Sequence, residues 1–404
     1  MYFCPSMKDI RDVKEAVQQK AENIYDELLE VRRHLHSNPE LSYEEFKTSE
    51  YVCEFLRKEG IPFKHGWVKT GITAEIQGNG PGKRIALRAD MDALPITEKT
   101  NLPFTSKNKG VMHACGHDVH TSCLLGAAKI LNSLKNSFSG TIQLIFQPGE
   151  ERLPGGASLM LKEGIFKKSK PEAVIGQHVY PQLRAGQVGF KPGMYMASAD
   201  ELHVTVKGKG GHAALPHNLV DPILISAHMI TALQQVISRN KNTLTPGILS
   251  FGYISGEGAT NVIPNEVKIK GTFRTMDEEF RTEAHEKMTR IAKGVVEGLG
   301  GEVDFKIDKG YPCVYNDEEV TARCMSYAKD YLGENNVKLL DLRMTAEDFA
   351  YYTQTAPGCF YRLGTAFPDR ENPGLHHPEF NVNEESLKTG IGLMAYITIK
   401  QLQQ

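Results

Sequence analysis

The segment MHACGHDVHTSC, residues 112–123, gathers side chains that could bind a metal ion. A thiolate and an imidazole together are suitable ligands for zinc, nickel, cobalt or manganese. Cys115 and His117 are separated only by Gly116, which lets the backbone turn sharply, so both side chains could face one pocket. The pair alone does not distinguish a metal site from the histidine-rich start of a helix. A disulfide between Cys115 and Cys123 is disfavoured, because seven cysteines scattered over a long chain are typical of reduced thiols in a cytoplasm.

Two adjacent carboxylates, Glu150 and Glu151, follow an apolar run in the segment FQPGEE. Neighbouring side chains on an extended backbone point in opposite directions, so one carboxylate could bind a metal while the other faces water or a substrate. Metal-assisted hydrolysis needs both a Lewis acid that lowers the pKa of water and a free carboxylate that takes its proton. The alternative is a surface turn, since Pro-Gly-Glu-Glu also suits turn formation.

Further candidate ligands lie at predicted strand ends or in loops. We expect His178 at the tip of the apolar strand that contains GQHV, and the segment GLHHPEF places His376 in a loop bounded by Pro and Gly. The segment RADMDALP offers Asp90 and Asp92, which share one face of a strand. Each residue alone has an ordinary structural interpretation, such as a hydrogen-bonded core histidine. Together they add two histidines and two more carboxylates to the cysteine–histidine pair.

Length, charge and hydropathy bound the class of protein. At about 100–200 residues per domain, the 404 residues suggest two or three domains. A net charge of −2 provides no basic surface for nucleic acid. No apolar run approaches the roughly 18 residues that span a bilayer, and residues 1–23 lack the continuous apolar stretch of a secretory signal. We therefore expect a cytoplasmic protein that binds neither nucleic acid nor membranes.

The elements predicted around these candidates form an α/β domain. Apolar spacing predicts helices at residues 14–36 and 121–134, and short runs rich in Ile and Val predict strands at residues 83–90, 141–151 and 172–179. Strands that alternate with helices indicate a mostly parallel central sheet flanked by helices. Ligand sites in such sheets lie at the carboxyl ends of the strands, where we expect Asp90, Glu150 and His178.

After Gly193 the pattern changes to half-exposed strands and a charged helix. The predicted order is strand, helix, two strands, helix, strand, in residues 201–209, 222–239, 247–255, 266–274, 277–298 and 302–307. This order is that of a ferredoxin-like α+β unit with an antiparallel sheet. We therefore predict a metal-binding catalytic domain of residues 1–196 plus 312–404 and an inserted domain of residues 197–311.

Nine segments resemble, in the same order, those of the aminoacylase/carboxypeptidase family of dinuclear metallopeptidases: VRRHLHSNPELSYEE, RADMDALP, MHACGHDVHT, FQPGEE, GGHAALPH, TNVIPNEV, GTFRT, TAEDFAYY and LHHPEF. The most similar subgroup is the amidohydrolases, which include hippurate hydrolases, N-acyl-L-amino acid amidohydrolases and plant auxin–amino-acid conjugate hydrolases. The resemblance extends from about Val31 to Phe380. Cys-Gly-His-Asp combined with Gln-Pro-x-Glu-Glu makes it specific.

The resemblance implies two divalent metal ions per subunit, which could be zinc, manganese, nickel or cobalt. By similarity the general base is Glu150, and the metal ligands are Cys115, His117, Glu151, His178 and His376. The inserted domain corresponds to the family's ferredoxin-like dimerisation lid. A homodimer or higher homo-oligomer is therefore implied.

Three residues of the inserted domain match groups that contact the substrate in the family. His212, in GGHAALPH, corresponds to a histidine that reaches the partner's active site and stabilises the developing oxyanion. Asn261 and Arg274 correspond to groups that hold the substrate carboxylate. An arginine suits that task because it can bind a carboxylate with two parallel hydrogen bonds.

The chain departs from the family at two places. Relatives in the broader carboxypeptidase branch have His-x-Asp where this chain has Asp90-Met91-Asp92, so Cys115 is expected to compensate for the missing histidine. The subgroup usually has Ala at the position of Gly149, and we expect the smaller residue to loosen the turn without removing chemistry. The resemblance assigns no firm role to Asp90, Asp92, Asp118, Glu347 or His377, although Asp92 or Asp118 could orient a ligand histidine, and His113 and His120 are expected to be structural.

The predicted function is metal-dependent hydrolysis of the amide bond of N-acyl-L-amino acids, for example N-acetyl or benzoyl derivatives. The products would be a carboxylic acid and a free amino acid. The alternative is a dipeptidase or carboxypeptidase with the same dinuclear mechanism. A non-catalytic metal-binding or assembly protein of the same fold is disfavoured, because Glu150 is present. The acyl group, the amino-acid preference and the physiological metal are left open.

Overall fold

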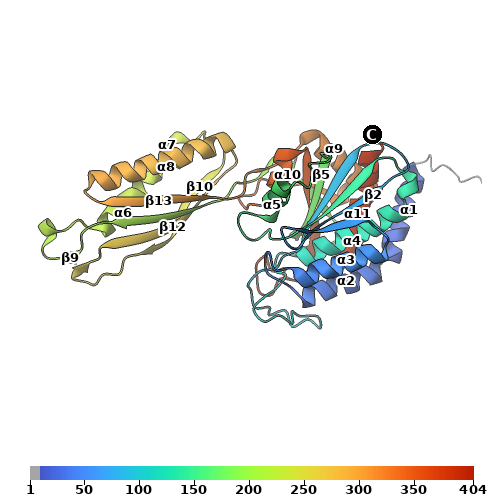
Figure 1. The fold of residues 1–404 in the computed structure, drawn as a ribbon, viewed down its shortest axis with the longest axis horizontal. Helices are drawn as coiled ribbons and strands as arrows, with labels where there is room; N and C mark the ends of the chain where they lie inside the picture. Colours follow the sequence, from blue (N-terminus) through green and yellow to red (C-terminus); the bar gives the residue numbers. More distant parts are fainter. Residues whose placement is uncertain (1–9) are drawn as a thin grey trace, which may run out of the picture. The chain divides into compact units, whose positions relative to one another are not determined.

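The computed structural model describes residues 10–404, and the chain divides into two compact units (Figure 1). Unit 1 comprises Met1–Gly193, Tyr315–Asp341 and Asp348–Gln404, and unit 2 comprises Met194–Val314 and Leu342–Glu347. Residues 1–9, which include Cys4 and the start of the segment predicted not to be a secretory signal, lie outside the described residues. No described helix is long and apolar enough to cross a membrane.

Unit 1 is built around an eight-stranded sheet in the order β1-β2-β4-β3-β5-β16-β6-β15. The central strands β4, β3, β5 and β16 are parallel to one another. They are buried over most of their length, as expected for apolar runs covered on both faces. The strands are β1 (Phe63–Trp67), β2 (Gly71–Gln77), β3 (Arg84–Asp90), β4 (Thr141–Gln147), β5 (Ala173–Arg184), β6 (Val188–Phe190), β15 (Val337–Leu339) and β16 (Gly358–Ala366).

Helices cover this sheet, and Figure 1 shows α4 and α11 on one side and α5 and α10 toward the other. A glycine allows the close approach of α4 to α11, because a Cβ at Gly126 would lie 2.8 Å from Cγ1 of Ile391. The helices of unit 1 are α1 (Ile10–Asn23), α2 (Tyr25–Ser37), α3 (Phe46–Lys58), α4 (His117–Ser133), α5 (Gly156–Glu163), α9 (Glu318–Leu332), α10 (Ala350–Thr355) and α11 (Ser386–Leu402).

The helix predicted at residues 14–36 is two helices that meet at Ile24. The φ and ψ of Ile24 are −100° and 1°, outside the helical range. Its N–H still donates to the Lys20 carbonyl at 3.1 Å, and its carbonyl accepts from the Leu28 N–H at 3.0 Å. The interruption is therefore a local change of dihedral angles within a continuous run of hydrogen bonds.

The prediction that His178 lies at the tip of a strand is wrong. β5 continues past His178 to Arg184, because Tyr180 and Arg184 remain paired with Gly364 and Ala366 of β16. The register shifts between these two pairs, and Pro181, which has no N–H to donate, falls within that irregularity.

Unit 2 contains a four-stranded antiparallel sheet in the order β10-β12-β8-β13. The predicted α/β class with an inserted α+β unit is confirmed, although the helix predicted at residues 222–239 is interrupted at Gln234. The elements are β8 (Asp200–Lys207), β9 (Gly211–His212), α6 (Pro222–Leu233), α7 (Gln235–Asn240), β10 (Gly247–Ser255), β11 (Val262–Ile263), β12 (Glu266–Thr275), α8 (Glu278–Gly298) and β13 (Glu302–Lys309). The short strands β7 (Gly193–Met196) and β14 (Val314–Asn316) lie where the chain passes between units.

Candidate metal centre

Three neighbouring strands of unit 1 deliver polar residues to one edge of the sheet. Asp90, the last residue of β3, pairs with Gln147, the last residue of β4, so the segments that follow both strands start side by side. Arg88 of β3 pairs with Gly176 of β5, which puts His178, two residues later, level with the end of β3. His178 therefore reaches this edge although its strand continues beyond it.

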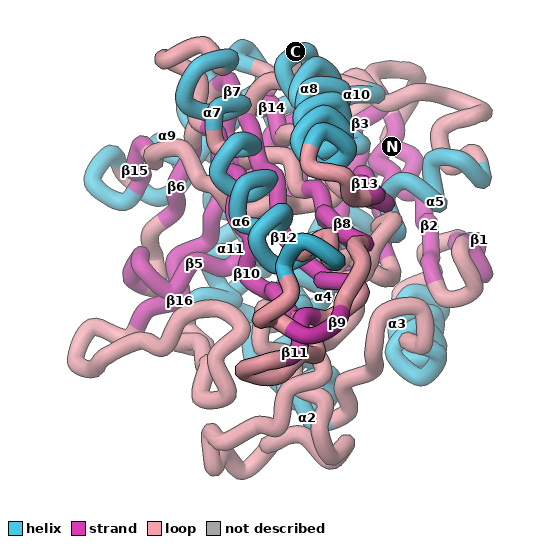
Figure 2. Tube along the Cα trace, turned by 90° about the vertical axis from the view of Figure 1, so that its left-hand side faces the viewer, coloured by secondary structure: helices cyan, strands magenta, loops and turns pink. Residues whose placement is uncertain are grey.

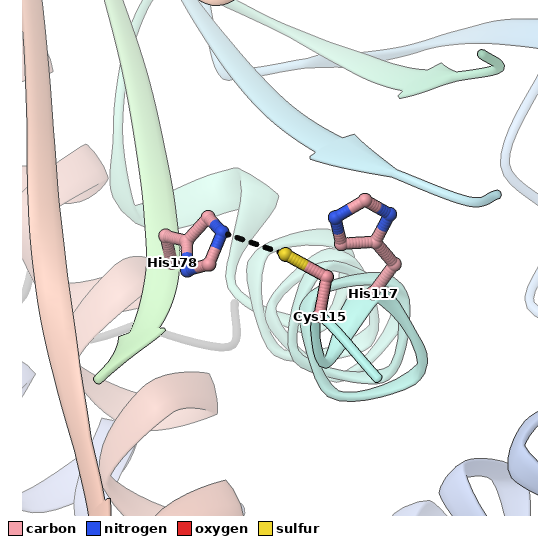
Figure 3. A group of neighbouring side chains, drawn as sticks. All are labelled: Cys115, His117 and His178. Atoms are coloured by element: carbon pink, nitrogen blue, oxygen red, sulfur yellow. Dashed lines mark hydrogen bonds between the residues drawn. The ribbon is translucent and has the colours of Figure 1, made fainter. Parts of the chain in front are cut away.

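Cys115, His117 and His178 are three neighbouring buried residues at this edge (Figure 3). Sγ of Cys115 lies 3.5 Å from Nε2 of His178, and the ligand atoms of all three residues lie within 4.8 Å of one another. His117 is the first residue of α4, and Gly116 before it has φ of 81°. A Cβ at Gly116 would lie 2.5 Å from Cγ2 of Val179, so both the backbone angle and the space require glycine.

Glu151 connects this group to the remaining candidates. Its Oε1 lies 3.2 Å from Nε2 of His376 and 3.9 Å from Nε2 of His117. Cys115, Glu151 and His376 form one set of potential ligands within 4.8 Å, and His117, Glu150 and Glu151 form another. The five predicted metal ligands and the predicted base thus lie in one connected cluster of unit 1.

Two buried histidines, His117 and His178, each have a lone pair on Nε2 that is available to a metal when the ring is neutral. Nδ1 of His117 donates to the Asp92 carbonyl, and Nδ1 of His178 donates to the Val179 carbonyl, each at 2.8 Å. Such bonds to the other ring nitrogen are typical of metal-binding histidines. Nε2 of His117 and Oε1 of Glu151 are buried without a hydrogen-bond partner among the described residues. Since buried polar atoms are rarely left unpaired, this donor set fits a divalent cation.

The charges of the cluster also favour a cation. Burial lowers the pKa of His117, but the carboxylates of Asp90 and Asp92 outweigh it and raise the pKa to about 10. Burial, with the carboxylates of Glu151 and Glu150, raises the pKa of the Cys115 thiol well above its usual range. A cation bound to either ligand must therefore displace a proton from it.

Glu150 and Glu151 lie in a turn rather than on a strand, because β4 ends at Gln147. Their N–H groups donate to the two carboxylate oxygens of Asp92, at 3.0 and 2.9 Å. Asp92 also accepts from the Ser42 hydroxyl at 2.6 Å, and its own carbonyl receives Nδ1 of His117. One aspartate thus orients a candidate ligand histidine and the backbone of both glutamates.

The prediction that Gly149 loosens this turn is wrong. Its φ is 61°, and a Cβ there would lie 2.3 Å from Cε1 of Tyr43, so the tyrosine ring fills the space an alanine would need. The Gly149 N–H donates to Oε1 of Glu45 at 2.8 Å. The smaller residue permits the close packing of Tyr43 against the turn, and its N–H bond to Glu45 holds the turn in addition.

His120 belongs to the frame of the site, whereas His113 is buried with neither ring nitrogen hydrogen-bonded among the described residues. Nδ1 of His120 donates to Asp90 at 2.6 Å, and its Nε2 accepts from the Val179 N–H at 2.9 Å, so neither nitrogen is available to a metal. Burial lowers the pKa of His113 to about 4, which keeps that ring neutral. Asp90 also accepts from Arg88 at 2.6 Å and so serves the frame of the site.

Asp118 binds helix α2 to the start of α4. It accepts from Nε of Arg32 at 2.9 Å and from Nδ1 of His36 at 2.8 Å. The motif VRRHLH, through Arg32 and His36, therefore holds the first turn of α4, which also contains His117. Nδ1 of His377 accepts from the Glu379 N–H at 3.1 Å within its own loop, and Glu347 belongs to unit 2.

His376 is the most accessible of the candidate ligands, with 52% of its side chain exposed. Its φ of 64° is in the left-handed region, which is uncommon for a residue other than glycine. The His376 N–H donates to the Ala114 carbonyl at 2.8 Å, so its loop is attached next to Cys115.

The other predicted site residues, His212, Asn261 and Arg274, all lie in unit 2. β9 pairs with β11 (Figure 2), with His212 opposite Val262. The Ala213 N–H donates to the Asn261 carbonyl at 3.0 Å, which brings His212 and Asn261 together. Nδ1 of the exposed His212 accepts from the Ala214 N–H at 3.1 Å, so Nε2 carries the proton in the neutral ring. Arg274 lies on β12, and its Nη1 donates to the Met344 carbonyl at 3.1 Å.

Reasoning from sequence missed Ser42, Tyr43 and Glu45, which line the turn of the two glutamates. Glu45 stands directly before an amphipathic helix, and its side chain makes no capping bond. The only signal was the position of these residues within a segment that resembles the family.

Comparison with known proteins gives consistent matches over most of the chain. Residues 86–400 match the family described as Peptidase family M20/M25/M40. An N-acyl-L-amino acid amidohydrolase of Geobacillus stearothermophilus is 42% identical over 306 residues, which are 76% of this chain and 82% of that protein. Thermostable carboxypeptidase 2 of Saccharolobus solfataricus is 38% identical over 397 residues, 96% and 99% of the two chains. The crystal structure of a dinuclear metal binding peptidase of Bacillus subtilis superimposes with a TM-score of 0.79 at 34% identity, over 95% of this chain and 99% of that one.

Proposed function

The chain belongs to peptidase family M20/M25/M40, and on that basis we propose that it is a dinuclear metal amidohydrolase that cleaves N-acyl-L-amino acids. Its products are a carboxylic acid and a free amino acid. The observation that carries the proposal is the pair of histidine Nε2 atoms beside Cys115, each set by a bond from Nδ1 to a backbone carbonyl. The relative from Geobacillus stearothermophilus, named for the same activity, supports it.

The metal ions and the base have separate tasks. Two divalent ions, which could be zinc, manganese, nickel or cobalt, would polarise the acyl carbonyl and lower the pKa of water when bound. Their ligands would be Cys115, His117, Glu151, His178 and His376. Glu150 takes the proton of the attacking water and later passes it to the departing amine. Its backbone is fixed by Asp92, which limits where the carboxylate can lie.

Unit 2 supplies groups that hold the substrate. The protonated Nε2 of His212 is suited to donate to the oxyanion that develops on the acyl oxygen. Arg274 and Asn261 bind the free carboxylate of the amino acid, for which the guanidinium supplies several donors. By the family resemblance, His212 acts in the active site of the partner subunit.

We infer that the chain forms a homodimer through the β10 edge of unit 2. β10 and β13 are the two edges of that sheet. β13 contains five charged residues, which protect an edge from pairing, whereas β10 contains none and exposes Tyr253 and Ile254 by 47% and 56%. A second copy that pairs along β10 would bury these side chains and its unpaired backbone groups.

The cytoplasm is the compartment we infer for the enzyme. All six described cysteines are free and buried, as expected for a protein of a reducing environment.

A carboxypeptidase or dipeptidase activity is the second candidate, favoured by the relative from Saccharolobus solfataricus. The two functions differ in what lies on the acyl side of the scissile bond. The acyl side is an amino acid with a free α-amino group for a dipeptidase, a peptidyl group for a carboxypeptidase and a simple acyl group for an aminoacylase. Matched pairs such as acetyl-methionine and glycyl-methionine would therefore separate them.

The proposal is tested with acetyl-, benzoyl- and longer acyl-amino acids, assayed after loading with zinc, manganese, nickel or cobalt. General-base assistance contributes about 10²–10⁴ in rate, so Glu150→Gln should lose most turnover and keep its metal. Glu151→Gln is the matched control and should lose metal as well. Normal turnover and full metal content in both variants would contradict the assigned roles, and preference for dipeptides throughout would favour the second candidate.

A further inference from the structure

The turn of residues 149–151 is held by buried carboxylates at three consecutive N–H groups. Asp92 receives the N–H groups of Glu150 and Glu151, as described above. The preceding N–H, that of Gly149, is received by Glu45, which has no exposed surface. Glu45 is not close enough to the cluster to be counted among its ligand sets. Its contact with the turn therefore needs an explanation other than metal binding.

Glu45 also fastens the two segments that enclose the turn. Its Oε1 accepts from the Tyr43 N–H at 2.9 Å as well as from Gly149, and its Oε2 accepts from the Thr70 hydroxyl at 2.7 Å. Thr70 follows two residues in the left-handed region, Val68 and Lys69, with φ of 47° and 75°. A β-branched residue in that region is unusual. The turn between β1 and β2 thus has an uncommon backbone conformation next to Thr70, the residue that contacts Glu45.

Tyr43 completes the enclosure by packing and by a second bond. Its ring occupies the volume where a Cβ at Gly149 would lie, and its hydroxyl donates to the Arg152 carbonyl at 2.8 Å, one residue beyond the turn. Tyr43 itself has φ of 68°. The turn is therefore gripped at both of its ends from the segment that includes Tyr43 and Glu45.

We propose that Tyr43 and Glu45 are positioning residues that set the direction in which the Gly149–Glu151 turn presents its two glutamates. This proposal rests on the proposed function, in which Glu150 is the base and Glu151 a metal ligand. Neither Tyr43 nor Glu45 touches the reacting atoms. Both act by fixing the backbone from which the acting carboxylates project, since a misplacement of about 1 Å can cost roughly 10²-fold in rate.

The first test is a double-mutant cycle between Glu45 and Glu150. Glu45→Ala removes the acceptor of the Gly149 N–H and should lower kcat at saturating metal by at least about tenfold, with a change of KM below about threefold. In the Glu150→Gln background the same change should cost less than about threefold in kcat, because the group it positions is gone. Equal losses in both backgrounds, or a wild-type kcat in Glu45→Ala, would overturn the proposal.

Glu45→Gln is the conservative control. Its amide oxygen can still accept from both N–H groups, and its NH₂ can donate to the Thr70 hydroxyl, which only has to rotate. We expect kcat within about threefold of wild type. A loss as large as in Glu45→Ala would show that the carboxylate charge, rather than the position of the turn, matters.

A second set of variants tests the proposal if Glu45→Ala does not fold. Tyr43 is half-buried, so Tyr43→Ala should fold. Gly149→Ala alone should be strongly impaired, and Gly149→Ala combined with Tyr43→Ala should be more active than Gly149→Ala, because the new methyl group then has room. A double variant no better than Gly149→Ala would contradict the packing role of Tyr43.

Metal binding separates this proposal from the proposed function. If Glu150→Gln turned over normally, the assignment of the base would fail. The side chain of Glu151 would still project from the same turn and could still bind metal. Glu45→Ala should then raise the zinc concentration for half-saturation, measured by chelator competition, by at least about tenfold. Unchanged zinc affinity in that case would refute the positioning role.

Discussion

Replacing Asp92 with asparagine should destabilise the turn of the two glutamates. The size of the effect follows from the number of side-chain oxygens that can accept hydrogen bonds. In the protein Oδ1 accepts from the Glu150 N–H, and Oδ2 accepts from the Glu151 N–H and the Ser42 hydroxyl. An asparagine has only one acceptor oxygen, so in either orientation its NH₂ faces at least one backbone N–H. A buried donor left without an acceptor costs about 1–3 kcal/mol.

Tenfold in an equilibrium corresponds to about 1.4 kcal/mol, so Asp92→Asn should populate the working turn about 5- to 150-fold less. The assay is kcat on an acyl-amino acid at saturating metal, with zinc affinity measured by chelator competition. Ser42→Ala is the matched control, because it removes one donor to Oδ2 and leaves both N–H acceptors in place. Its effect should be clearly smaller. Wild-type kcat and zinc affinity in Asp92→Asn would refute the reasoning.

Three further predictions concern the ligands, the substrate and the dimer. Cys115→Ala should lower metal content, and chelation of the wild type should abolish activity until a divalent ion is added; full activity in chelated protein would contradict the metal centre. Amidation of the substrate carboxylate should reduce kcat/KM at least about tenfold in wild type, since a charge-assisted bond contributes about 1.5–3 kcal/mol, but far less in Arg274→Ala. His212→Ala and Glu150→Gln should each be nearly inactive, and subunit exchange between them should restore up to about a quarter of wild-type activity, because half the dimers are mixed and each has one intact site. Verified mixed dimers without recovery would place His212 in its own subunit or outside catalysis.

The fold class could be predicted because strands and helices that are buried have recognisable patterns of apolar residues in the local sequence. The predicted strands at residues 83–90 and 141–151 each contain consecutive apolar residues, as strands covered on both faces require, and both contain a strand of the central sheet, although β4 ends at Gln147. The end of β5 could not be predicted in the same way. After Val179 the sequence contains Pro181, which normally argues against a strand, and only pairing with β16 keeps the chain extended.

The candidate ligands could be selected because their side chains are chemically distinctive and stand in short motifs. Their supports could be predicted only in part: Asp92 was expected at most to orient a ligand histidine, and neither its bonds to the N–H groups of the two glutamates nor the role of Glu45 was foreseen, because each partner lies far away in the chain. Asp92 is 58 residues from Glu150, and Glu45 is 104 residues from Gly149. An aspartate near a strand end and a glutamate before a helix look ordinary in sequence, and no periodicity reports which distant N–H they will meet. The same limit explains why Gly149 suggested looseness, since the ring of Tyr43 comes from another segment.

Nε2 of His117 and Oε1 of Glu151, which are buried without a hydrogen bond among the described residues, have a consequence for the lifetime of the protein. They exist as a cluster only in the folded chain, so a cation that they bind shifts the folding equilibrium. A ligand at 100 times its dissociation constant adds about 2.7 kcal/mol to the stability of the folded state. Metal scarcity should therefore remove molecules as well as activity, because the unfolded fraction exposed to proteases rises as the site empties. The abundance of this enzyme would then report the availability of its metal.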